Sequence, residues 1–270
     1  MENLLNRILE KDGCKIHYWT VRQNGRPWLI FLHGAGLDHQ MFADQVPALR
    51  GRFSLLLVDA RGHGLSRPMG KEFCIQLFID DLMMIMSQEK ISKATFIGQS
   101  LGGNIAQEIA FFYPDKVESL VLIGCTCNTM KLSSLEGLLL KISPRILSYY
   151  PWHFLLKQIA EVSALSQPVR DYIKEAINTV GKKDFVHVFS QTLACLHNED
   201  GYKIPKDVLL LCGKHDHTGN IKRVAPKWAE LDPRYQFYFI EDAAHCANQD
   251  NPNEVNRILL NFLNTHYNQK

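Results

Sequence analysis

The sequence lacks the features that mark nucleic-acid-binding, secreted and membrane-spanning proteins. No run of five or more Lys or Arg occurs and the formal net charge is +2, so nothing indicates nucleic acid as a partner. The longest apolar stretches are far shorter than the roughly 18 residues that span a bilayer. The start of the chain lacks a secretory apolar core. We therefore expect a soluble, cytoplasmic protein with no membrane span.

Cysteine occurs, but not in a pattern that indicates disulfides or a metal centre. The seven cysteines are an odd number scattered through apolar segments, which is typical of reduced thiols. The pair in Cys125-Thr126-Cys127 has the wrong spacing for a zinc knuckle, and no second Cys or His pair follows closely. We expect neither a metal nor a cofactor. The sequence also contains no internal repeat and no low-complexity tract.

The chain is long enough, at 270 residues with 46% hydrophobic residues, to bury a large core. Short, continuous apolar runs alternate with amphipathic segments, which predicts an α/β fold with a mostly parallel central sheet flanked by helices. An opening hairpin is expected over 7–23, and further strands over 28–32, 53–58, 94–98, 117–124, 208–212 and 236–240. Helices are expected over 40–49, 73–89, 101–112 and 252–265.

The alternation of strand and helix stops between residues 127 and 207. This segment gives only helical patterns, broken at Pro144, Pro151 and Pro168, so we expect a helical cap inserted into a core domain formed by 1–126 and 208–270. Its many Leu, Tyr, Trp and Phe residues exceed what a solvated appendage needs. We expect some to form the cap's own small core and others to make an apolar pocket wall at the carboxyl edge of the sheet.

The stretch around Ser100 carries the strongest chemical signal. It reads Gly98-Gln99-Ser100-Leu101-Gly102 and lies between a predicted strand and a predicted helix, whereas the same pentapeptide alone could be a flexible loop. A sharp turn from strand to helix pushes the serine side chain outward and requires glycine on both sides. The backbone N–H of Leu101 could then stabilise a developing oxyanion at the helix N-terminus.

Two glycine-containing loops follow earlier predicted strands. In His33-Gly34-Ala35-Gly36 the N–H of Ala35 is a candidate second oxyanion donor, although a plain turn explains the same residues. The later loop contains Asp59 and His63. Since no partner is implied by their spacing, we expect both to fix the loop by hydrogen bonds.

The carboxyl ends of the last two predicted strands provide an acid and a base. His245 follows the final strand, and a serine nucleophile requires such a base, neutral near pH 7. Asp216 follows the preceding strand and could orient the imidazole, with Asp242 as a rival on the same loop as His245. His215 and His217 flank Asp216, so a metal site with His245 is an alternative.

In this order, the motifs resemble those of the α/β-hydrolases, specifically the small capped serine hydrolases that include carboxylesterases, enol-lactonases and pimeloyl-carrier methyl ester esterases. The resemblance covers residues 15–265 and is weak only in the cap. It implies Ser100 as nucleophile, His245 as general base and acid, Asp216 as orienting carboxylate, and the N–H groups of Ala35 and Leu101 as the oxyanion hole. It rests on His33-Gly34-Ala35-Gly36, the loop from Asp59 to Ser66, Gly98 to Gly103, Gly213-x-x-Asp216 and Ala244-His245.

The resemblance implies a hydrolase acting on a small to medium, mainly apolar carboxylic ester or lactone. Residues expected to contact that substrate are His33, Gly34, Gln99 and Trp152. Haloalkane dehalogenases and epoxide hydrolases carry Asp at the elbow, so their chemistry does not transfer to Ser100. A ligand receptor that keeps the triad, a carbon-carbon bond hydrolase and a perhydrolase are alternative functions. The sequence does not predict the oligomeric state.

Overall fold

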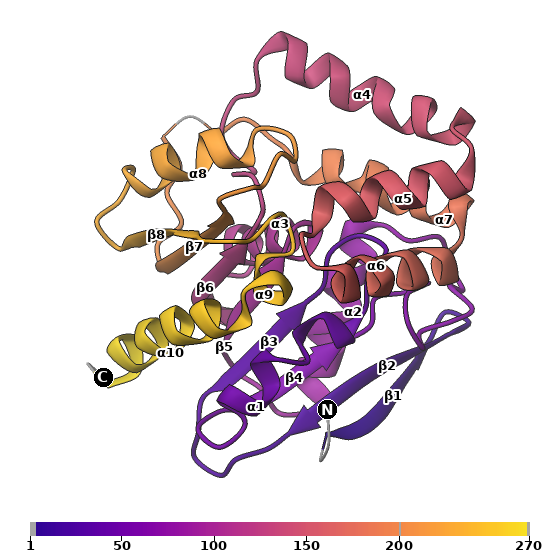
Figure 1. Ribbon diagram of the computed structural model, residues 1–270. Helices are drawn as coiled ribbons and strands as arrows, with labels where there is room; N and C mark the ends of the chain where they lie inside the picture. The colour runs from indigo at the N-terminus through magenta and orange to yellow at the C-terminus, as the bar shows by residue number, and fades with distance from the viewer. Residues whose placement is uncertain (1–3, 200, 269–270) are drawn as a thin grey trace.

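The computed structural model describes residues 4–199 and 201–268, which form one eight-stranded sheet with the strand order β1-β2-β4-β3-β5-β6-β7-β8 (Figure 1). Strands β1 and β2 form the expected hairpin and pair antiparallel, β2 pairs antiparallel with β4, and all other neighbours are parallel. The predicted fold class is therefore confirmed. The strands are β1 (Leu5–Lys11), β2 (Cys14–Val21), β3 (Trp28–Leu32), β4 (Ser54–Val58), β5 (Ala94–Gln99), β6 (Val117–Ile123), β7 (Asp207–Gly213) and β8 (Tyr235–Ile240).

The inner strands are apolar on both faces because helices cover both sides of the sheet. Alternate residues of β3 separate accordingly: Ile30 and Leu32 join one buried cluster, and Leu29 and Phe31 join the other. Side chains of α2 (Ile75–Gln88), α3 (Leu101–Phe112) and α8 (Ile221–Ala229) complete the first cluster. The second contains side chains of the 3-10 turn η1 (His39–Phe42), α1 (Gln45–Leu49) and α10 (Pro252–Asn268).

Two helices differ from the expectation. The segment 40–49 is not one helix but η1 followed by α1, because Asp38 caps η1 through the Gln40 N–H and the chain turns before Gln45. Helix α8 was not predicted at all. Two further short elements are the 3-10 turn η2 (Pro114–Lys116) and α9 (Ala247–Asp250).

Between β6 and β7 lie α4 (Ser134–Tyr149), α5 (Trp152–Ser163), α6 (Gln167–Val180), α7 (Lys182–Gln191) and the 3-10 turn η3 (Thr192–Cys195). Figure 1 shows these helices gathered at one end of the molecule, with α4 outermost. Buried residues of α5, α6 and α7, including Ala160, Ile173 and Phe185, pack into the second cluster. The segment is thus anchored on the same apolar layer as α1 and α10.

The expected break at Pro144 is wrong, because α4 continues through it. A proline inside a helix removes the N–H that would bond to the carbonyl four residues earlier, here that of Leu140. The hydroxyl of Ser143 donates to that carbonyl at 2.9 Å and so replaces the missing donor. Pro151 and Pro168, by contrast, lie at helix starts as expected.

All seven cysteines are unpaired and six are buried. Among the described residues, no helix is both long enough and apolar enough to cross a membrane.

Candidate active site

Ser100 occupies a strained turn between β5 and α3. Its φ of 51° and ψ of −119° lie outside the regions that non-glycine residues ordinarily adopt. The turn is held by the Ser100 N–H, which donates to the Ile123 carbonyl at 2.9 Å. A Cβ at Gly98 would lie 2.4 Å from the Gly102 carbonyl oxygen, and one at Gly102 would lie 2.0 Å from the Leu32 carbonyl oxygen. Both glycines are therefore required for β5, α3 and β3 to approach this closely.

Asp216 and His245 meet at the carboxyl ends of β7 and β8. The Nδ1 of His245 lies 3.0 Å from Oδ2 of Asp216, and both side chains are buried. Burial alone would raise the pKa of Asp216, but the charge and hydrogen bond of His245 and the N–H of Thr218 outweigh it, so this pKa lies below its ordinary value. Asp216 is therefore a carboxylate that can hold the imidazole in one tautomer.

The two rival assignments receive no such support. Asp242 is exposed, with a φ of 48°, on the turn after β8. His215 and His217 are also exposed, whereas Asp216 between them is buried. Within residues 4–199 and 201–268, no three His, Cys, Asp or Glu side chains gather in an arrangement that could hold a metal ion.

The candidate oxyanion donors lie beside the serine. Leu101 is the first residue of α3, and Ala35 lines a cavity together with Ser100. In the described part of the chain, neither N–H donates to a protein acceptor. Gln99 links the His245 loop to the Gly34 turn. Its Nε2 donates to the His245 carbonyl at 3.2 Å, and its Oε1 lies so close to Gly34 that a Cβ there would be 2.2 Å from it.

The glycine-containing loops are fixed by buried histidines and an aspartate, as expected for Asp59 and His63. Oδ1 of Asp59 accepts the His39 N–H at 2.8 Å, and Oδ2 accepts the Leu65 N–H at 2.9 Å. His63 Nε2 accepts the Gly36 N–H at 3.1 Å. His33 has a similar role, because its Nε2 accepts the Ala60 N–H at 3.0 Å and its Nδ1 bonds to the Gly34 carbonyl at 2.8 Å.

Burial lowers the pKa of both histidines. The pKa of His33 falls below its ordinary value, and that of His63 falls to about 3. Both rings are therefore neutral at physiological pH and act as structural hydrogen-bonding groups. His33 does not line the cavities described next, so it supports the Gly34–Ala35 turn instead of forming the pocket wall expected for it.

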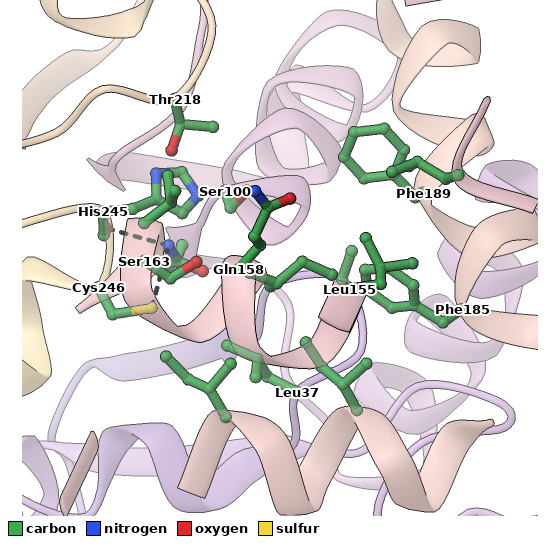
Figure 2. Close-up of a pocket in the computed structure, with 18 residues that line it drawn as sticks. Leu37, Ser100, Leu155, Gln158, Ser163, Phe185, Phe189, Thr218, His245 and Cys246 are labelled. Carbon is green, nitrogen blue, oxygen red and sulfur yellow. Dashed lines mark hydrogen bonds between the residues drawn. The ribbon is translucent and has the colours of Figure 1, made fainter. Parts of the chain in front are cut away.

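Two cavities meet at Ser100. The smaller, of about 360 Å³, is lined by Gly34, Gln99, Ser100 and His245 and by apolar side chains of α5, α6 and α7 (Figure 2). The larger, of about 770 Å³, lies between α4 and the start of α8 and includes Ser100, Asp216, Asn220 and Arg223. Figure 2 shows Gln158, Leu155 and Phe189 around the space beside Ser100 and His245. Ala35, Thr218 and Phe189 also line both cavities.

Trp152 does not line either cavity, contrary to its expected contact with substrate. Its indole N–H donates to the Asn178 Oδ1 at 3.0 Å, and its ring lies 6.2 Å from that of Phe185, measured between ring centres. The tryptophan therefore braces α5 against α6 and α7. Cavity residues that the sequence did not reveal are Gln158, Ser163, Thr218, Phe185 and Phe189, none of which belongs to a motif with a fixed spacing.

Comparisons with known proteins agree with the overall fold. A family model described as alpha/beta hydrolase fold matches residues 27–154. The chain is 23% identical over 279 aligned positions to human epoxide hydrolase 4, covering 94% of this chain and 77% of that protein. A hydrolase from Pseudomonas aeruginosa PA01 superposes with a TM-score of 0.81 at 20% identity, covering 97% of this chain and 98% of the other. The enol-lactonase from Burkholderia xenovorans LB400 superposes with a TM-score of 0.78 at 21% identity, covering 93% of this chain and 97% of the other.

Proposed function

We propose that this chain, which has the α/β-hydrolase fold, is a serine hydrolase that cleaves a carboxylic ester or lactone through an acyl-enzyme on Ser100. The main support for the proposal is that Ser100, His245 and Ala35 line one cavity, while Asp216 bonds to the His245 ring. Residues 127–207 act as the cap that closes this cavity. The similarity to epoxide hydrolase 4 does not transfer its named chemistry, because the elbow residue here is Ser100.

The proposed reaction begins when the Ser100 hydroxyl gives its proton to Nε2 of His245 and its oxygen attacks the substrate carbonyl carbon. Asp216 bonds to Nδ1–H and stabilises the imidazolium. The N–H groups of Ala35 and Leu101 stabilise the negative oxygen of the tetrahedral intermediate. His245 then protonates the leaving alcohol oxygen as the C–O bond breaks, which leaves an ester on Ser100.

The second half repeats these roles with water. His245 accepts a proton from a water molecule while the oxygen of that water attacks the acyl carbon. The imidazole later returns a proton to the Ser100 oxygen. The acid is released and the free serine is restored. The apolar walls of the smaller cavity, including Leu155, Ile173 and Phe185, support an uncharged, mainly apolar acyl group as the substrate part bound there.

Turnover of p-nitrophenyl acetate and butyrate by the purified chain tests this proposal. We expect saturable hydrolysis that Ser100→Ala lowers by roughly three orders of magnitude in kcat, the scale seen when a triad member is removed. Normal folding of Ser100→Ala, checked by circular dichroism, is the control. No turnover of any ester or lactone in a broad panel by the folded chain would contradict the proposal and favour a receptor function.

A further inference from the structure

Helix α4 directs a wide apolar face to solvent. Its six large apolar side chains on this face recur at intervals of three and four residues, so they share one side of the helix. Contiguous exposed patches of this kind mark interaction surfaces in soluble proteins. We call this set the α4 apolar face: Leu135 (65% exposed), Leu138 (54%), Leu139 (52%), Ile142 (39%), Ile146 (56%) and Tyr149 (81%).

The opposite side of α4 already has its packing partners. Leu140 and Ser143 line the larger cavity, and Leu147 lines the smaller one. Of the α4 apolar face only Leu139, at its edge nearest Ser143, also lines the larger cavity. At the start of the helix, Glu136 accepts hydrogen bonds from Asn220, at 3.0 Å, and from Arg223, which ties α4 to the start of α8. The α4 apolar face therefore points away from the protein core, and Figure 1 shows α4 as the outermost helix at its end of the molecule.

The unpaired charges beside this face are positive. Residues 131–150 contain three Lys or Arg and a single carboxylate, Glu136, which is bonded to Arg223. On a helical projection Lys141 and Arg145 fall along one border of the face, and both are exposed. No carboxylate in the described residues lies within ion-pair distance of either cation. The face thus combines apolar side chains with uncompensated positive charge.

We propose that the α4 apolar face docks on an anionic lipid surface, with Leu138, Ile142 and their neighbours entering the interface and Lys141 and Arg145 contacting the headgroups. A helix with an apolar face bordered by cations binds such surfaces by apolar burial and electrostatic attraction together. A second copy of this chain fits less well, because it would bring the same cations and no carboxylate to the contact.

The test of docking does not depend on the proposed catalysis, because vesicle binding is measured without substrate. The purified full chain is mixed with vesicles of phosphatidylcholine alone or with vesicles in which one third of the lipid is phosphatidylglycerol, and bound protein is quantified by sedimentation. We expect binding to the anionic vesicles that weakens as salt rises, and much weaker binding to phosphatidylcholine.

Two double variants identify the surface. Leu138→Gln with Ile142→Gln, and separately Lys141→Ala with Arg145→Ala, should each weaken binding to anionic vesicles by roughly tenfold or more. Since all four side chains are exposed and none lines a cavity, the variants should keep the wild-type melting temperature. The matched control is Phe112→Gln, which removes a side chain that is 57% exposed at the end of α3 and should leave binding unchanged.

Three results would overturn the proposal. One is the absence of binding to anionic vesicles at low salt, and another is equal binding to both vesicle types. The third is a dimer in analytical ultracentrifugation that Leu138→Gln with Ile142→Gln dissociates, without any vesicle binding, which would assign the face to a second copy of the chain.

Discussion

The Nδ1 of His245 lies 3.0 Å from Oδ2 of Asp216, although the two residues are 29 positions apart in the chain. The contact arises because β7 and β8 are parallel neighbours, so the loops after them leave the same edge of the sheet. On the loop after β7, Asp216 is buried between exposed His215 and His217. Asp242, the rival from sequence, is exposed.

Asp216→Asn should therefore lower kcat by roughly 10³- to 10⁴-fold, because the amide favours the wrong tautomer of His245. Asp242→Asn is the matched control and should retain near-wild-type kcat, since Asn tolerates the positive φ at this position. Steady-state kinetics on one p-nitrophenyl ester compares the two. A greater loss in Asp242→Asn would assign the acid to the β8 loop.

The preferred length of the substrate acyl chain should be set by the size of the smaller cavity. Each added methylene should raise kcat/KM roughly two- to fourfold until the cavity is full, and the gain should then stop, because a packed wall does not expand. Phe189 lines both cavities, so Phe189→Ala should widen the connection between them and move the optimum to longer acyl chains. The measurement is kcat/KM for p-nitrophenyl esters from acetate to decanoate, with Phe112→Ala as control.

The same series with a terminal carboxylate on the acyl chain checks the apolar character of the site. Lys141, Arg145 and Lys157 are all exposed, as expected from the sequence, so none should bind a substrate carboxylate. Faster turnover of the carboxylate series, weakened by Arg145→Ala, would contradict the apolar assignment.

Buried His63 should make the protein less stable in mild acid. Its pKa falls to about 3 in the folded protein, mainly through burial, from an ordinary value of 6.5. The unfolded chain therefore binds a proton that the folded chain does not between these values, and the free energy of unfolding should fall as pH falls. The loss approaches about 1.4 kcal/mol per pH unit for this one histidine.

Urea unfolding at several pH values below about 6.5 measures this slope. His63→Gln should lower the free energy of unfolding at every pH, but it should reduce the slope of that free energy against pH by the equivalent of about one bound proton. His153→Gln, at an exposed position, is the control and should leave this slope unchanged. Equal slopes in the wild type and His63→Gln would show that His63 is not held neutral in the folded state.

The strands and the candidate catalytic residues could be predicted because they depend on local patterns. Continuous apolar runs bounded by turns specify buried parallel strands, and parallel strands bring Ser100, Asp216 and His245 to one edge. The cap could not be predicted to this degree. At Pro144 the Ser143 hydroxyl supplies the donor that the proline lacks, and α4 packs on α7 and bonds to the start of α8. The contacts with α7 and α8 join segments far apart in the chain, so no local pattern predicts them.

The position of Trp152 illustrates the same limit. A tryptophan in an apolar segment near a site is as suited to bracing helices as to contacting substrate, and only the location of Asn178, 26 residues later, decides between them. Helix α8 was missed because Pro226 lies inside a segment of only nine residues, which weakens its helical pattern.

Ser100 is the proposed nucleophile, and covalent labelling identifies a nucleophilic serine. The most direct measurement treats the folded chain with a fluorophosphonate, digests it and locates the adduct by mass spectrometry. We expect one equivalent of label on Ser100, with no labelling in Ser100→Ala and much slower labelling in Asp216→Asn. Labelling of another residue, or an unmodified Ser100 in a chain that hydrolyses esters, would contradict this assignment.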